Sequence, residues 1–127
     1  LSLMKKIMLP GQYRLKNKKA FDATYRNHKI VSDSVITIYC GKSKKDSSLP
    51  TRFGFVVSKK YNKRAVKRNR IKRLMRECVR LAIKEKKLDK LNNYMSFIIM
   101  PKVSENSFKL KLKDVENSFY KLIQKIK

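Results

Sequence analysis

A dense run of positive charge occupies residues 59–76, whose sequence is KKYNKRAVKRNRIKRLMR. Ten of these eighteen residues are Lys or Arg, and none is acidic. An exposed helix normally mixes Glu with Lys three or four residues apart, because like charges at that spacing destabilise the helix. A run without acids needs an anionic partner, and the phosphates of a nucleic acid supply one. The segment therefore predicts a nucleic-acid contact rather than a solubilising face.

The charge of the whole chain indicates the same class of partner. The 127 residues hold 34 Lys and Arg against 9 Asp and Glu, a formal net charge of +25. Residues 1–76 hold 22 basic and 3 acidic side chains, whereas residues 77–127 hold 12 and 6. No apolar stretch approaches the roughly 18 residues of a membrane span, and the first nine residues lack a signal-peptide core. We therefore predict a cytoplasmic nucleic-acid-binding protein without a membrane contact.

Aromatic side chains accompany the charge in the basic half of the chain. The unstacked bases of a single strand can lie on such rings, for about 1–3 kcal/mol each. Helical spacing places Phe21 and Tyr25 on one face, and strand alternation places Tyr39 on the mixed-polarity face of its strand. For these three rings the pattern leaves a base-binding cleft and a core position equally open. We expect Phe53 and Phe55 to belong to the core.

Helices and strands alternate along the chain as in a single domain. Apolar spacing predicts helices over residues 16–26, 62–88 and 108–126, and β-branched and aromatic runs predict strands over 29–32, 35–40, 52–58 and 94–100. The turn-rich loop 41–51 is expected to join the strands 35–40 and 52–58 as a hairpin. In the long helix, an apolar stripe that should face the sheet comprises Ile71, Leu74, Met75, Cys78 and Ala82. The class is α+β, a two-layer α/β sandwich.

Residue types for independent catalysis are scarce. His28 is the only histidine and is expected in a loop, and the three acids of the basic half are dispersed, so no carboxylate cluster for metal-assisted hydrolysis is indicated. Cys40 and Cys78 lack metal-ligand spacing and are expected to be reduced core residues. We predict no catalytic residue and no metal ligand set in the chain. One domain should span residues 1–127, with 1–12 as a flexible N-terminal segment.

Two strings in the basic half carry a family resemblance. Residues 52–60 read RFGFVVSKK, and residues 65–77 read AVKRNRIKRLMRE. The run KRNRIKRLMR, behind a strand that ends in SKK, resembles the RNR motif of the bacterial ribonuclease P protein. The string LKNKKAFDATY at residues 15–25 is similar to the first helix of that family. The resemblance covers nearly the whole chain.

The resemblance implies a fold, a division of labour and a set of contact residues. It implies the order αβββαβα with a left-handed β-α-β crossover, the ribosomal-protein-S5-domain-2-like type. The RNA subunit performs the hydrolysis with divalent metal, Mg²⁺ expected, at a site in the holoenzyme RNA, and the protein alone binds no metal tightly. Phe21, Tyr25 and Tyr39 line a cleft for the precursor leader. The residues implied to contact RNA are Lys59, Lys60, Arg64, Lys67, Arg68, Asn69, Arg70, Lys72, Arg73 and Arg76.

The expected function is that of the protein subunit of ribonuclease P, an endonuclease that removes the 5′ leader from precursor tRNA. Its partners would be ribonuclease P RNA and precursor tRNA, and the protein alone would be a monomer. Another small basic RNA-binding module, such as a ribosomal protein, would share charge and size but has no reason to carry the SKK and RNR strings together. A DNA-binding helix stays open, because counterion release does not distinguish phosphates by their sugar.

Overall fold

The structure, a computed structural model, describes residues 9–26, 29–44, 48–88, 91, 93–103 and 109–126. Its elements are η1 (Gly11–Tyr13), α2 (Lys18–Arg26), β1 (Lys29–Ser32), β2 (Ile36–Cys40), β3 (Arg52–Phe55), α3 (Ala65–Lys84), β4 (Ser96–Pro101) and α4 (Leu112–Ile123). Apart from the short 3₁₀ turn η1, this is the αβββαβα order that the resemblance implies. The α+β class is confirmed.

The four strands form one sheet in the order β1-β2-β4-β3. β4 pairs antiparallel with β2 and parallel with β3, so the predicted β2–β3 hairpin is wrong. Phe97, Ile98 and Ile99 are all buried, which makes β4 apolar on both faces and suits it to the interior of the sheet. β3 reaches β4 through α3, because parallel neighbours need a long crossover connection. The left hand of this crossover stays a prediction.

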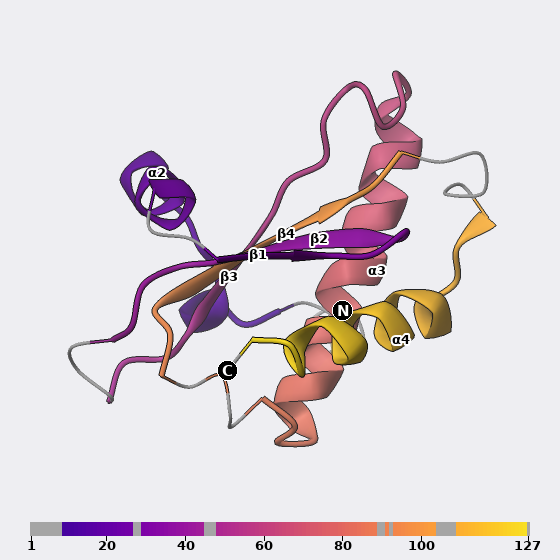
Figure 1. The fold of residues 1–127 in the computed structure, drawn as a ribbon. Coiled ribbons are helices and arrows are strands. Elements are labelled where there is room, and N and C mark those ends of the chain that lie inside the picture. The colour runs from indigo at the N-terminus through magenta and orange to yellow at the C-terminus, as the bar shows by residue number, and fades with distance from the viewer. Residues whose placement is uncertain are drawn as a thin grey trace.

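Helices cover both faces of the sheet. Figure 1 shows α2 on one side and α3 with α4 on the other. The sheet and the α3/α4 layer enclose the main core and correspond to the two layers of the predicted sandwich. Core side chains from the sheet are Ile36, Ile38, Cys40, Phe53, Phe97 and Ile99, and those from α3 and α4 are Ile71, Met75, Cys78, Val79, Ala82, Val115, Phe119 and Leu122. The opposite face of the sheet is left for α2.

The apolar stripe of α3 follows the predicted spacing with two differences. Ile71, Met75 and Cys78 are buried as expected, and Val79 is also buried, whereas Leu74 is only half-buried. Residues three or four apart share one helical face, so burying this stripe turns the basic residues between its members outward. The periodicity therefore orients the whole basic run.

The ends of the chain depart from the prediction. Leu9 is 1% exposed and belongs to the core, so the segment 1–12, predicted to be flexible, contains at least one packed residue. The predicted helix 108–126 begins at Leu112, where the Asp114 carboxylate accepts a hydrogen bond of 2.8 Å from the Lys111 backbone N–H. Residues 1–8, His28 and Phe108 lie outside the described residues.

Both cysteines are free and buried, as predicted. Burial raises the pKa of the Cys40 thiol to about 11 and raises the pKa of the Cys78 thiol further. Since the thiolate is the reactive form, neither cysteine of the folded protein should react with iodoacetamide at pH 8, and both should react in denaturant. Mass spectrometry of the alkylated protein tests this. A single rapid adduct on the native chain would contradict the packing of that cysteine.

Candidate RNA interface

The basic run continues from the turn after β3 into α3, and its side chains face solvent. None of its ten Lys and Arg forms an ion pair with a described residue, and the two ion pairs between described residues, Arg80–Glu77 and Lys87–Glu85, lie beyond it. The positive charge is therefore uncompensated within the described chain. Of the predicted contact residues, Arg68 and Lys72 are half-buried and the exposed ones are Lys59, Lys60, Arg64, Lys67, Asn69, Arg70, Arg73 and Arg76.

Arg68 and Arg70 also hold the protein's own backbone. The Arg68 guanidinium donates to the carbonyl oxygens of Asn62 at 2.9 Å and Lys63 at 2.8 Å, in the turn that precedes α3. Arg70 donates to the carbonyl oxygen of Leu110 at 2.7 Å, which ties α3 to the segment before α4. Substituting either arginine should therefore change folding as well as charge.

Arg14, which lies outside the run of residues 59–76, adds a further cation to the basic face. Its backbone forms a parallel bridge with Phe53, and its Nε donates to the Leu9 carbonyl at 2.7 Å. Desolvation by the surrounding protein, together with the nearby positive charges of Arg14 and Arg73, lowers the pKa of the Arg76 guanidinium. Three cations that repel one another form a favourable position for a phosphate. Sequence gave no sign of Arg14, because only the fold brings it to α3.

The three predicted cleft aromatics lie on the face of the sheet that carries α2. The rings of Tyr25 and Tyr39 meet edge to face, with centroids 5.1 Å apart. Burial, and then the neighbouring Tyr39, raise the pKa of Tyr25. Phe21 lies against Gly54 of β3, where an added Cβ would come within 2.5 Å of the Phe21 ring. All three rings are half-buried, so part of each faces solvent.

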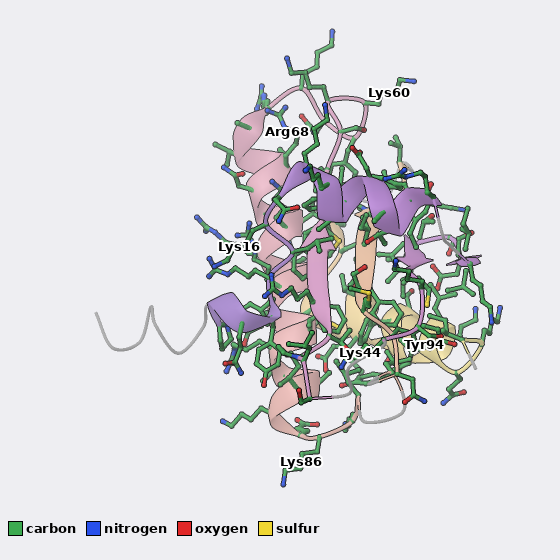
Figure 2. The ribbon with its side chains drawn as sticks, turned by 90° about the vertical axis from the view of Figure 1, so that its left-hand side faces the viewer. Lys16, Lys44, Lys60, Arg68, Lys86 and Tyr94 are labelled. Carbon is green, nitrogen blue, oxygen red and sulfur yellow. The ribbon has the colours of Figure 1, made fainter. Side chains whose placement is uncertain are left out.

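The basic run and the aromatic rings share one side of the molecule. In Figure 1 the first turns of α3 extend past the sheet to the side on which α2 lies. In Figure 2, which looks onto α2, Lys60 and Arg68 lie above this helix, near the top of the molecule. A single nucleic-acid strand could therefore contact phosphate-binding cations and base-stacking rings at once, which are the two components of a single-strand site.

Neither a metal site nor a membrane span is visible in the part of the chain that the structure describes. No three His, Cys, Asp or Glu side chains come together there in a group that could hold a metal ion. No described helix is both long and apolar enough to cross a bilayer. The surface chemistry that the described residues do offer is cationic and aromatic.

Comparisons with known proteins agree on one family. The chain matches the family model described as Ribonuclease P over residues 9–127. The ribonuclease P protein component of Clostridium kluyveri is 34% identical over 113 residues, which are 89% of this chain and 93% of the relative. That of Microcystis aeruginosa is 41% identical over 78 residues, 61% of this chain and 65% of the relative. The alignments to the latter and to the Synechococcus protein cover less than two thirds of those relatives, 65% and 56%.

Solved structures share the fold. The ribonuclease P protein of Thermotoga maritima superposes with a TM-score of 0.71 at 22% identity, covering 90% of this chain and 97% of that one. The Staphylococcus aureus protein gives 0.67 at 23% identity, covering 91% and 95%. The family match spans almost the whole chain, and these structures share its overall fold. The chain belongs to the ribonuclease P protein family.

Proposed function

We propose that this chain is the protein subunit of ribonuclease P and binds both the catalytic RNA and the single-stranded 5′ leader of precursor tRNA. The observation that carries the proposal is the juxtaposition of an uncompensated cationic helix with the aromatic rings beside α2. Family membership supports the enzyme assignment, endonucleolytic processing of precursor tRNA as part of a ribonucleoprotein. Ribonuclease P RNA is the partner that the family implies.

The protein contributes binding and positioning, while the RNA contributes the reaction centre. Phosphate contacts of the basic run orient the subunit on RNA without reading its sequence. Divalent metal, Mg²⁺ expected, would be held by the RNA and would supply charge stabilisation for hydrolysis. Among the described side chains, no three His, Cys, Asp or Glu residues come together in a group that could hold such an ion. We further propose that the protein alone is monomeric, acts in the cytoplasm and contacts no membrane.

The leader accounts for substrate discrimination in this proposal. Precursor and mature tRNA differ by the leader, so binding energy placed on the leader favours substrate over product. Each base stacked on Phe21, Tyr25 or Tyr39 would add about 1–3 kcal/mol. Product then dissociates more readily than substrate, because it cannot make these contacts.

Reconstitution with ribonuclease P RNA tests the proposal. At a Mg²⁺ concentration that supports only slow cleavage by the RNA alone, adding the protein should accelerate 5′-leader removal at an unchanged cleavage site. The protein without RNA should leave the precursor intact. An equal rate with and without the protein, under conditions in which the two bind, would contradict the assignment.

Gly54 offers a test of the aromatic cleft that removes no aromatic ring. In Gly54→Ala the new Cβ would lie 2.5 Å from Cε1 and 2.7 Å from Cζ of Phe21, so the ring must move. We expect weaker precursor binding in the holoenzyme with mature-tRNA binding unchanged. Gly11→Ala is the matched control, because its Cβ would come near only the flexible end of Lys16, with Nζ at 3.1 Å. Equal leader affinity for both variants would argue against Phe21 as a leader contact.

A further inference from the structure

A concavity lies beside α2, and none of the three predicted cleft aromatics lines it. It has a volume of about 390 Å³, and α2 contributes Ala20, Ala23 and Thr24 to its lining. At about 100° per residue, Ala20 and Ala23 fall to one side of the buried Thr24, and Phe21 and Tyr25 fall to the other. α2 therefore has an alanine flank and an aromatic flank. The concavity belongs to the alanine flank.

Large apolar side chains are left in solvent at the mouth of this pocket. Leu49 is 54% exposed and Met95 is 42% exposed, and both line the pocket. The lining also includes Leu15, which is buried, and Ala20 and Pro50, which are half-buried, and these residues add further apolar surface. Exposed apolar side chains around a concavity indicate a site for a flat or apolar group. A nucleobase presents such a surface on both of its faces.

Cations accompany the apolar lining. Lys42, Lys44 and Arg52 line the same pocket, and none of its described lining residues is acidic. Lys42 and Arg52 are exposed, so their charges are accessible from solvent. At the inner wall the hydroxyl groups of Thr24 and Ser96 are hydrogen-bonded to each other, which leaves that wall without an unsatisfied buried polar atom. The pocket thus combines a surface for a base with positions for a phosphate.

The pocket and the basic run lie on different sides of α2. In Figure 2, Lys60 and Arg68 lie above α2, whereas Lys44 lies below it on the side facing the viewer. None of Phe21, Tyr25 and Tyr39 lines the pocket, so the pocket is separate from the predicted leader cleft.

We propose that this pocket binds one nucleotide of single-stranded RNA, with the base against Leu49, Met95 and Ala20 and its phosphate on Arg52 and Lys42. The inference rests on the proposed function in taking single-stranded RNA as the ligand, and it adds a second site on the opposite flank of α2. The apolar lining alone would suit many groups. The surrounding cations, in a chain of net charge +25, favour a polyanion that carries aromatic bases.

Methyl NMR of the full chain, titrated with a six-nucleotide oligoadenylate, tests this site directly. Binding should shift the methyl signals of Ala20, Ala23, Leu49 and Met95. The double variant Lys42→Ala/Arg52→Ala should bind the oligonucleotide about ten-fold more weakly, and its salt slope should fall by about 1.4, or 0.7 for each lost single-strand contact. Ala20→Leu, which fills the pocket without changing charge, should abolish the pocket shifts and keep those of the aromatic flank.

The double variant Lys113→Ala/Lys125→Ala is the control for the loss of two positive charges. Both lysines are exposed in the α4 region and lie outside the pocket. If the pocket double variant loses no more affinity than this control, or if RNA shifts only signals of the aromatic flank, the pocket site is overturned and the leader-binding proposal stands. If the pocket signals shift with protein concentration in the absence of RNA, the occupant is a second copy of the chain and the inference also fails. Failure of the proposed function is recognised separately, as a holoenzyme that binds precursor and mature tRNA equally.

Discussion

Replacing Arg73 and Arg76 together by alanine should weaken binding to ribonuclease P RNA without destabilising the protein. Both side chains are exposed on α3, and the charges of Arg14 and Arg73 act against that of Arg76. Removing two of three mutually repelling cations relieves this repulsion, and alanine has the highest helix propensity. The thermal midpoint should therefore stay the same or rise while RNA affinity falls.

Salt dependence gives the size of the effect. If each arginine neutralises one phosphate, the slope of log K against log salt should fall in magnitude by about 1.4–1.8 in the double variant. Filter binding between 50 and 200 mM salt, alongside a thermal melt, measures both quantities. Lys113→Ala/Lys125→Ala removes the same charge from the α4 region and should leave the slope nearer that of the wild type. A double variant with an unchanged slope would place the RNA elsewhere.

Arg68→Ala should behave differently from the double variant. Its guanidinium donates to two carbonyl oxygens in the turn before α3, and each hydrogen bond from a charged donor contributes about 1.5–3 kcal/mol. Arg68→Ala should therefore lower the thermal midpoint as well as the RNA affinity. The thermal midpoint thus distinguishes Arg73 and Arg76, which are predicted only to contact RNA, from Arg68, which also stabilises the fold.

Removing the rings of Phe21 and Tyr25 should abolish most of the preference for leader-bearing tRNA. Both rings are half-buried beside the sheet, and the ring centroids of Tyr25 and Tyr39 lie 5.1 Å apart. If each ring holds one base, Phe21→Leu/Tyr25→Leu should weaken precursor binding by about ten-fold or more, since 1.4 kcal/mol is a factor of ten. Mature tRNA should bind the variant holoenzyme as it binds the wild type.

Phe53→Leu is the matched control for this loss. Phe53 belongs to the same sheet but faces the core, where it stacks on Phe97 with centroids 5.6 Å apart. The control should lower stability and leave the ratio of precursor to mature affinity unchanged. The cleft assignment fails if both variants reduce that ratio to the same extent, because general loosening of the sheet would then explain the loss.

Local patterns predicted the parts of the fold that depend on neighbours in sequence. The spacing of Ile71, Met75 and Cys78 indicated both the long helix and its buried face, and strand alternation placed Tyr39 on the mixed-polarity face of its strand. The pairing of β2 with β4 could not be found in this way. It joins Cys40 to Phe97, far apart in the chain, and a hairpin between consecutive strands was the simpler expectation.

The candidate site was predictable to a similar degree. Charge density without acids indicated the basic run, and helical spacing placed Phe21 and Tyr25 together. Arg14 escaped detection because a backbone bridge to Phe53, and no motif, positions it near α3. The pocket of the alanine flank escaped as well, since it is assembled from four separate segments of the chain. The hydrogen bonds of Arg68 to the backbone could be recognised only from the geometry of the turn at Asn62.

The most direct test of the central claim is the affinity of the reconstituted holoenzyme, at one fixed salt concentration, for precursor tRNA and for the same tRNA without its leader. Leader contacts worth about 1–3 kcal/mol per base predict a preference of about ten-fold to several hundred-fold for the precursor. The preference should shrink in Phe21→Leu/Tyr25→Leu. Equal affinity of the wild-type holoenzyme for both tRNAs would contradict leader binding by this subunit.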